Sequence, residues 1–347
     1  MTAVDPQAEH GRRLLHIGLW LLLLLGLSHA LSRAGRLQQL GAIRWPSDLY
    51  ALQYVDPGEV DLLVLGTSRA GFGLAPTAID PCLSEALGRP ARSWSWTRAS
   101  AGLWSLEQLA RAAVPRLRPR VVALELSPEM MSVRHYGHET SARSGILPED
   151  LPDCLAGASG LAGVDACLSA LTRPLESLAF LDQRHDPAPP QLRWMAIHAR
   201  GGQFCFGSPA CRAHNARFEA VLERRRSDRR AEVIPKVRSE RFAGFRIGPP
   251  QTTAWERLRA LLAEHDAQLI ILLMPLSAAY AAEVPGEAEA NFKAWLQAAA
   301  PGLPALDRAR AWPDEEGLFI DADHLNARGA LRLSGDLCRA TAPLIGD

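Results

Sequence analysis

Short apolar segments separated by segments with helical periodicity restrict the fold of this chain more than any other feature. "DLLVLG" (61–66), "RVVALELS" (120–127) and "AQLIILLMPLS" (267–277) are apolar runs that end at glycine or at polar residues. Such runs are typical of strands buried in a parallel sheet. "SWSWT" (93–97), which alternates serine with tryptophan, predicts a further strand, and the short apolar piece "PALD" (304–307) fits the same series.

Helical periodicity occupies the intervals between these strands. Where the periodicity resumes after residue 250, Thr253 and Glu256 predict an N-terminal capping box. The alternation predicts an α/β fold, a doubly wound and mostly parallel sheet flanked by helices, with functional groups at the carboxyl ends of the strands. The segments with helical spacing are 76–88, 103–114, 253–266, 291–300 and 327–343.

A long uncharged run lies near the N-terminus. Between Arg13 and Arg33 there are 19 residues without charge, which as a helix would span ~28 Å at ~1.5 Å per residue. Because a bilayer core is ~30 Å thick, this run predicts a transmembrane anchor within 1–36. A cleaved signal peptide is the alternative, since Arg12 precedes the run and Ser-His-Ala at 28–30 resembles a cleavage site. Both interpretations predict that the remainder is exported.

Beyond this segment we predict a connector at 37–60 and one α/β domain at 61–347. From about 134 to 250 the periodicity gives way to proline, glycine, cysteine and charged residues. We interpret this stretch as an irregular insertion that covers the rim of the active site as a lid. The alternative is a scaffold without ligand contact. The 38 basic and 38 acidic residues balance, which argues against a nucleic-acid partner.

The cysteines also indicate an oxidising compartment. Their even number allows up to three disulfides in 15 connectivities. Cys205 and Cys211 bracket "FGSPA", and Cys154 and Cys167 bracket a Gly/Ala-rich loop, so we predict pairing of neighbours. Six buried thiols are the alternative, whereas metal binding fits worse because no Cys-x-x-Cys pair is present. The six are Cys82, Cys154, Cys167, Cys205, Cys211 and Cys338.

Two short motifs carry chemistry. "DLLVLGTSRAGFGL" places Ser68 at a turn after the first predicted strand, and "FIDADHLNARGAL" (319–331) places Asp321 and His324 before the last predicted helix. A serine hydroxyl becomes a good nucleophile when an imidazole accepts its proton and a carboxylate orients that imidazole. Taken alone, the serine turn could bind phosphate or cap a helix, and Asp-x-x-His could be a surface turn. Together they predict a catalytic triad.

"VLGTSRAGFGL" and "FIDADHLNARGA" resemble the first and last blocks of the SGNH (GDSL-like) hydrolase superfamily. The resemblance covers roughly 61–134 and 250–347. It implies that Ser68 is the nucleophile, that His324 is the general base and that Asp321 orients it, without a metal or organic cofactor. The Gly-x-Ser-x-Gly elbow of α/β-hydrolases fits less well, because that elbow follows several strands and its acid and base lie far apart in sequence.

The same resemblance implies the composition of the oxyanion hole. One donor would be the backbone N–H of Ser68, and a second would be that of Gly102 in "RASAGLWSL", although Gly102 could equally serve as a helix-entry glycine. The family's third block supplies an asparagine side chain, but the matching stretch here, "LELSPEMMS", contains Glu125 and no asparagine. Ser127 is the alternative third donor, since a glutamate cannot donate unless it is protonated.

Further candidate residues lie near the predicted cleft. We predict Arg69, together with His135 and Tyr136 of "VRHYGHE", as substrate-binding residues. A metal pair in that stretch is the alternative, and it fits less well because helical ligands are usually three or four residues apart with an acid nearby. Trp94 and Trp96 would either pack in the core, which we favour, or form a sugar-stacking platform.

An N-terminal anchor combined with "LGTSR" and "DxxHLNxxGA" patterns resembles the SGNH-like partners of membrane-bound O-acyltransferases, as in alginate acetylation or teichoic acid D-alanylation. The resemblance implies a single-pass protein of the bacterial inner membrane whose extracytoplasmic domain transfers acyl groups on a surface or secreted glycan. The partner would be a membrane-bound O-acyltransferase. Two alternatives remain: an esterase or deacetylase that releases acyl groups to water, and a non-catalytic subunit that binds polymer or partner.

Overall fold

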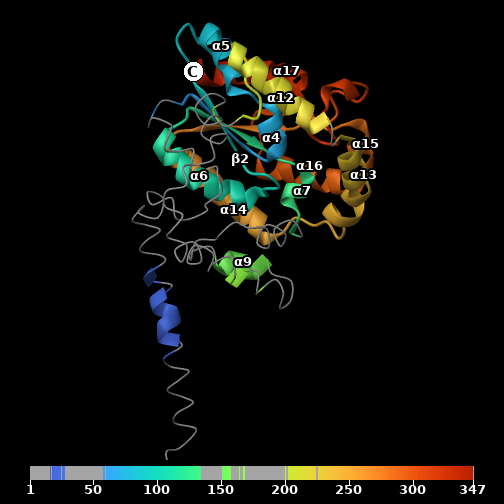
Figure 1. The fold of residues 1–347 in the computed structure, drawn as a ribbon. Coiled ribbons are helices and arrows are strands. Elements are labelled where there is room, and N and C mark those ends of the chain that lie inside the picture. Colours follow the sequence, from blue (N-terminus) through green and yellow to red (C-terminus); the bar gives the residue numbers. More distant parts are fainter. Residues whose placement is uncertain are drawn as a thin grey trace, which may run out of the picture.

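The structure, a computed structural model, contains a five-stranded, all-parallel sheet with helices on both faces (Figure 1). It describes residues 60–133, 151–157, 202–223 and 226–346, together with positions 16, 18–24, 26, 27, 58, 164, 167, 168 and 200. The strand order is β2-β1-β3-β4-β5. The strands are β1 (Leu62–Gly66), β2 (Ser93–Thr97), β3 (Val121–Glu125), β4 (Gln268–Leu273) and β5 (Ala305–Asp307).

The central strands are buried on both faces, which explains their continuous apolar sequence. Successive side chains of a strand point to opposite sides. Leu63 and Leu65 accordingly enter one core, whereas Leu62 and Val64 enter the other. All five strands predicted from the sequence are present, and the predicted doubly wound arrangement agrees with the observed parallel sheet.

Each face of the sheet is covered by helices that arise from both ends of the domain. On one face lie α6 (Leu103–Leu117), α14 (Pro249–Glu264) and α16 (Gly286–Ala299). On the other lie α4 (Ser68–Gly73), α5 (Pro76–Leu87) and α17 (Ala327–Gly346). Helices α5 and α17 lie side by side (Figure 1), so the last helix packs against one of the first.

The capping box predicted at Thr253 and Glu256 is wrong. Helix α14 begins at Pro249, with Gly248 as N-cap and no side-chain capping bond, so Thr253 already lies inside the helix. Proline suits the first helical turn because its fixed φ is helical and its missing N–H would have had no partner there.

The part of the predicted insertion that the structure describes is more regular than we expected. It contains α12 (Pro209–Glu223), α13 (Arg226–Lys236) and a π-helical turn, η5 (Val237–Arg241). An additional short helix, α9, spans Leu151–Gly157. Most side chains of α12 are wholly or partly exposed, so this helix lacks a strong apolar stripe. Arginine and glutamate are good helix formers, and a mostly polar helix shows little periodicity to a reader of the sequence.

All six cysteines form disulfides. Cys154 bonds Cys167 and Cys205 bonds Cys211, which confirms the predicted pairing of neighbours. The third bond joins Cys82 of α5 to Cys338 of α17, across a sequence separation of 256 residues. It therefore links the beginning of the α/β domain to its last helix.

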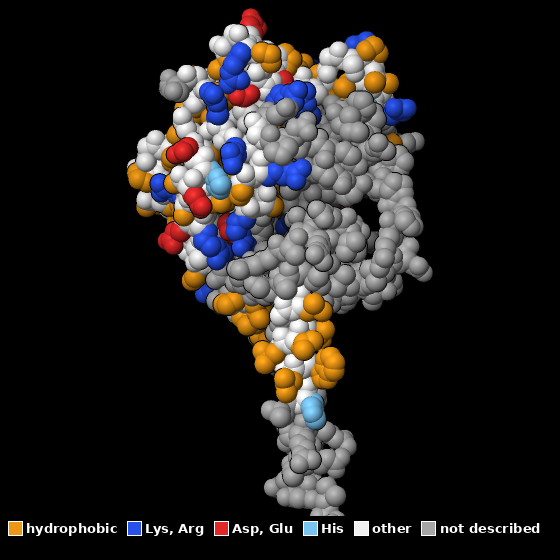
Figure 2. Space-filling model, turned by 90° about the vertical axis from the view of Figure 1, so that its left-hand side faces the viewer, with side chains coloured by type: hydrophobic (Ala, Val, Ile, Leu, Met, Phe, Trp, Pro, Cys, Tyr) orange, Lys and Arg blue, Asp and Glu red, His pale blue; other side chains and the backbone are white. Residues whose placement is uncertain are grey.

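The predicted anchor and connector lie largely outside the described residues. Residues 16, 18–24, 26 and 27 are helical, and the leucines among them are exposed (Figure 2). Within the portions of the chain that can be described, no helix combines the length and apolarity needed to cross a membrane.

Candidate active site

The predicted catalytic residues meet at the carboxyl edge of the sheet. The chain leaves β1 toward β2 on one side and later returns to β3 on the other side of β1. In open α/β sheets such a reversal opens a crevice at the ends of the strands, where ligands bind. Ser68 follows β1 directly at this position, and His324 lies on the loop that precedes α17.

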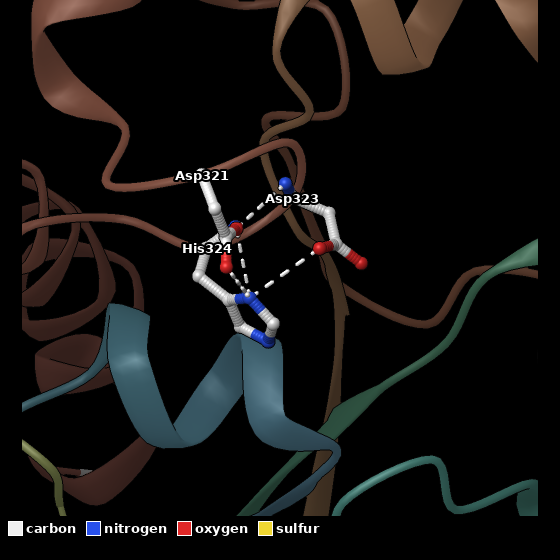
Figure 3. Close-up of side chains that lie close together, drawn as sticks. All are labelled: Asp321, Asp323 and His324. Carbon is white, nitrogen blue, oxygen red and sulfur yellow. Dashed lines mark hydrogen bonds and ion pairs between the residues drawn. The ribbon is translucent and has the colours of Figure 1, made fainter. Parts of the chain in front are cut away.

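Ser68, His324 and Asp321 form a hydrogen-bonded relay. The Ser68 Oγ lies 2.8 Å from Nε2 of His324. Both carboxylate oxygens of Asp321 lie 2.9 Å from Nδ1 of the same ring, and Figure 3 shows this carboxylate facing the imidazole. A carboxylate at Nδ1 favours the tautomer protonated there, which leaves Nε2 free to accept the serine proton.

The loop itself holds the carboxylate in place. The Oδ1 atom of Asp321 accepts hydrogen bonds from the backbone N–H groups of Asp323, at 3.1 Å, and of His324, at 2.9 Å. The side chains of Asp321 and His324 are buried, with exposed fractions of 5% and 2%. Three residues of spacing therefore allow one turn to present both the acid and the base.

The turn that carries Ser68 has most of its backbone donors in use. Thr67 is the N-cap of α4, and its Oγ1 accepts the N–H of Arg69 at 3.1 Å. The N–H of Ala70 bonds Glu125, and that of Gly71 bonds the carbonyl of Thr67. Within the described ranges, no hydrogen bond involves the backbone N–H of Ser68, so this donor can face a developing oxyanion.

Glu125 holds this turn from the end of β3. Its carboxylate is fully buried and accepts hydrogen bonds from the Thr67 N–H at 2.6 Å, the Thr67 hydroxyl at 2.8 Å and the Ala70 N–H at 3.2 Å. Burial raises the pKa of Glu125, although Arg69 and these hydrogen bonds oppose the shift. From the sequence, Glu125 stood where the family's asparagine donor is absent, whereas in the structure it is an acceptor. The signal for this role is the helix that begins directly after β1. Its first N–H groups need acceptors, and Glu125 ends the neighbouring strand β3.

Arg69 points into the protein behind the triad. Its guanidinium lies 2.9 Å from Glu129 of α7 (Pro128–Met131), 2.7 Å from the hydroxyl of Tyr280 in α15 (Ala278–Glu283) and 3.2 Å from Asp323. Burial alone would lower the pKa of Arg69, but these partners raise it overall. Because its contacts are all to the protein, the role of Arg69 in binding substrate stays a prediction.

Asp323, which the sequence motifs did not indicate as a site residue, is a second carboxylate beside the imidazole. Its Oδ1 lies 3.3 Å from Nδ1 of His324 (Figure 3). Burial would raise the pKa of Asp323, but His324, Arg69 and Arg241 lower it below its ordinary value.

The ligand atoms of Asp321, Asp323 and His324 lie within 4.8 Å of one another, close enough to be considered for a metal ion. Asp321 already bonds His324, and Arg69 and Arg241 place positive charge against Asp323. A cation bound here would have to displace those contacts.

The other predicted site residues have less defined positions. Gly102 is the N-cap of α6, directly after the loop that follows β2. Ser127 is the N-cap of α7, and its buried Oγ has no hydrogen-bond partner within the described part of the chain. Their roles in the oxyanion hole stay predictions, and His135 and Tyr136 lie outside the described residues.

Aromatic side chains line one side of the His324 imidazole. The ring centroid of Phe72 lies 4.5 Å from that of His324, and Phe218 of α12 lies 5.6 Å from Phe72. The insertion thus contributes directly to the surroundings of the site. Trp94 and Trp96 are only 5% and 1% exposed, which confirms that they pack in the core.

The insertion also supports the loop that carries Asp321 and His324. Arg230 of α13 donates a hydrogen bond to the carbonyl of Asp321 at 3.3 Å. Glu219 of α12 accepts the N–H of Ala327, at the start of α17, at 2.8 Å. Arg241 of η5 lies 3.5 Å from Asp323. Helices α12, α13 and η5 of the insertion therefore each contact the loop that carries Asp321 and His324 or the start of α17 that follows it.

No model of a known protein family matches the chain, and comparison with curated proteins finds no similar sequence. The interpretation of this site therefore depends on its geometry and on the motifs in its sequence.

Proposed function

We propose that this protein is an SGNH-type serine acyl-transfer enzyme. The observation that carries the proposal is the relay from the Ser68 hydroxyl through His324 to Asp321, with 2.8 Å and 2.9 Å between successive partners. These distances lie within the range over which a general base takes a proton. A buried imidazole oriented by a carboxylate and bonded to a partly exposed serine is the arrangement that activates a hydroxyl nucleophile.

In the first half of the reaction, Ser68 Oγ attacks the carbonyl carbon of an acyl ester and passes its proton to Nε2 of His324. The carbonyl oxygen becomes an oxyanion, which the backbone N–H of Ser68 would stabilise together with that of Gly102. The tetrahedral intermediate then collapses, the imidazolium protonates the leaving alcohol oxygen, and the acyl group remains on Ser68.

In the second half, an acceptor hydroxyl gives its proton to Nε2 of His324 and its oxygen attacks the acyl-serine carbonyl. Collapse of this second intermediate returns the proton to Ser68 Oγ and releases the new ester. When the acceptor is water the product is a carboxylic acid, so transferase and esterase differ only in the molecule that enters second. The aromatic wall of Phe72 and Phe218 would restrict water beside the imidazole and so supports transfer.

The proposed setting is the outer side of a bacterial inner membrane, with the N-terminal apolar segment as a single-pass anchor. Three disulfides support an oxidising compartment. The acceptor would be a surface or secreted glycan, and a membrane-bound O-acyltransferase would supply the acyl group. The SGNH resemblance of the two sequence motifs is the basis of this partner and substrate class.

The test is covalent labelling of Ser68. Wild-type protein should react with a fluorophosphonate, and peptide mass spectrometry should place the adduct on Ser68. Ser68→Ala should abolish the adduct and lower turnover of an acyl-nitrophenyl ester by at least ~1000-fold. Ser239→Ala, at an exposed serine of η5, is the matched control and should retain both.

Adding soluble oligosaccharide to the ester assay separates the remaining functions. Acyl-oligosaccharide as product supports transfer, whereas rapid release of acid regardless of the acceptor identifies an esterase. A wild-type protein that forms no adduct and whose Ser68→Ala variant preserves surface acylation in cells would instead be a non-catalytic subunit.

A further inference from the structure

Two carboxylates, rather than one, face the same nitrogen of the catalytic imidazole. Nδ1 of His324 lies 2.9 Å from both oxygens of Asp321 and 3.3 Å from Oδ1 of Asp323 (Figure 3). The triad requires only Asp321. The second carboxylate is buried, at 6% exposure, and a buried charge is costly unless it is paired. Its position beside the imidazole therefore calls for a role.

The other oxygen of Asp323 is held by the residue that follows the nucleophile. Oδ2 of Asp323 accepts hydrogen bonds from Nε of Arg69 at 3.3 Å and from its Nη2 at 3.2 Å. Arg69 and Asp323 each lie next to a catalytic residue in the sequence, Ser68 and His324 respectively, and are separated by 254 positions. The pair therefore connects the nucleophile turn to the acid–base loop.

Arg241 from the insertion reaches the same carboxylate oxygen, at 3.5 Å. Arg69 and Arg241 both donate to the hydroxyl of Tyr280, at 2.7 Å and 2.8 Å, and that hydroxyl donates to Glu129. The two guanidiniums thus face two carboxylates and a phenol, and burial raises the pKa of Tyr280. This network fixes where the charge of Asp323 lies.

We propose that Asp323 is a positioning residue for the catalytic imidazole: Arg69 and Arg241 orient it so that its carboxylate stabilises the protonated form of His324 while its link to Arg69 holds that ring opposite Ser68. The inference deepens the proposed acyl-transfer function and rests on it. It adds a second acid to the relay and gives the insertion a defined part in the chemistry.

The sign of the effect follows from the charges that face the ring. Asp321 and Asp323 face Nδ1, Ser68 faces Nε2, and Phe72 of α4 lies against the ring. Beyond these, Glu125 lies behind the serine turn, and Arg230 donates to the Asp321 carbonyl. The charged and titratable groups around Asp323 are Arg69, Arg241, Tyr280 and Glu129. Removing the charge of Asp323 makes protonation of the ring less favourable, and removing that of Arg241 makes it more favourable.

The experiment follows the rate of Ser68 labelling by a fluorophosphonate as a function of pH. Labelling needs neutral His324, so its acid limb reports protonation of the ring in the free protein. Asp323→Asn should move this limb down by about one pH unit and slow labelling at neutral pH by about 10-fold. Arg241→Met should move the limb in the opposite direction by a smaller amount.

Two controls define the comparison. Asp336→Asn, at a carboxylate paired with Arg308 and Arg339 on α17, removes a charge elsewhere and should leave the limb in place. Asp321→Asn should abolish labelling by roughly 10⁴-fold, since the triad acid fixes the tautomer, which separates the two aspartates.

Shifts of the acid limb in opposite directions for Asp323→Asn and Arg241→Met support the inference. If both variants fold and the acid limb stays at the wild-type pH, the inference is overturned, even when labelling is slower. If Asp323→Asn does not fold, Arg241→Met decides alone, because Arg241 lies at the edge of the network and its side chain is 35% exposed. Wild-type protein that is not labelled at Ser68 would overturn the acyl-transfer function itself, an outcome distinct from labelling with an unmoved limb.

Discussion

At the scale of single residues, the approach of Glu125 to the nucleophile turn depends on Gly66. A Cβ atom at position 66 would lie 2.5 Å from the Cβ of Ala70 and 2.6 Å from Oε2 of Glu125. Both neighbours are fixed, one by the helix and the other by its three hydrogen bonds. The absence of a side chain at Gly66 therefore allows a buried carboxylate to hold the turn that presents Ser68.

We expect Gly66→Ala to lower the free energy of unfolding by about 2 kcal/mol or more through overpacking and to reduce Ser68 labelling. Gly286→Ala is the control, because a Cβ there meets no atom within 4 Å, and it should change stability by less than about 1 kcal/mol. Urea unfolding and fluorophosphonate labelling measure the two effects. Equal behaviour of the two variants would show that the turn can relax around the added methyl group.

The raised pKa of Glu125 predicts a pH dependence of stability. The folded protein keeps a proton on Glu125 at pH values where the unfolded chain has lost it. The contribution of Glu125 to the free energy of unfolding is thus full at low pH and is lost as pH rises through the raised pKa. Glu125→Gln does not titrate, so the stability of wild type relative to this variant should fall as the pH rises from the ordinary glutamate range through the raised pKa of Glu125. A difference that stays constant across this range in urea unfolding would contradict the assignment.

The sequence predicted Ser68, Asp321 and His324 as neighbours because their spacing and order match a triad. It did not predict the roles of Glu125 or Asp323. Both roles depend on the direction in which each carboxylate points once the sheet has formed. Neighbouring residues can point in opposite directions, so the sequence alone does not show whether a carboxylate accepts hydrogen bonds, acts as a base or lies at the surface. The proximity of Arg69 to Asp323 spans 254 positions and has no local signature.

At the scale of elements, the short helix α4 depends on Thr67. Its hydroxyl oxygen accepts a hydrogen bond from the Arg69 N–H, and the same hydroxyl donates a hydrogen bond to Glu125. One side chain therefore caps the helix and satisfies the buried carboxylate. The cap fixes the direction in which Ser68 leaves β1.

We expect Thr67→Ala to lower the free energy of unfolding by about 1–2 kcal/mol and to slow Ser68 labelling, because the cap and the bond to Glu125 are lost together. Thr67→Ser keeps the hydroxyl and should retain most of both properties. Thermal unfolding and labelling rates compare the variants. If Thr67→Ser is as impaired as Thr67→Ala, the methyl group rather than the hydroxyl is the important part.

The strands were predictable because burial on both faces leaves uninterrupted apolar runs such as 62–66 and 268–273. Helix α12 was not, because most of its side chains are wholly or partly exposed and leave no clear apolar periodicity. The start of α14 was misplaced for a related reason: Pro249 and a preceding glycine begin the helix, while a capping-box pattern occurs by chance one turn later.

At the scale of the whole molecule, an early helix and the last helix of the domain pack as one unit. Helices α5 and α17 pack together and share the Cys82–Cys338 disulfide. A crosslink stabilises more when it closes a longer loop of the unfolded chain, and this one closes 256 positions, against 6 for Cys205–Cys211.

We expect replacement of both Cys82 and Cys338 by serine to lower the free energy of unfolding by about 3–5 kcal/mol, and the same change at Cys205 and Cys211 by about 2 kcal/mol. Calorimetry of the two double variants gives the comparison. A larger loss at Cys205 and Cys211 would show that native packing around these buried sulfurs outweighs loop length.

The alternation of strands and helices predicted the class of fold, and the insertion was predicted to lie over the rim of the site, but the residues through which it contacts the loop of Asp321 and His324 could not be predicted. Arg230, Arg241 and Glu219 contact the acid–base loop only because α12, α13 and η5 fold back over the sheet edge. Charges in a solvated helix and charges that brace a loop have the same sequence pattern, so three-dimensional packing alone distinguishes them.

The distance in sequence between Ser68 and His324 has a consequence for biogenesis. Until the segment that contains His324 has been synthesised and has folded, the Ser68 hydroxyl lacks the imidazole to which it is hydrogen-bonded. The proposed acyl transfer therefore cannot begin before α17 has docked against α5. Activation of the proposed nucleophile is thus coupled to completion of the fold.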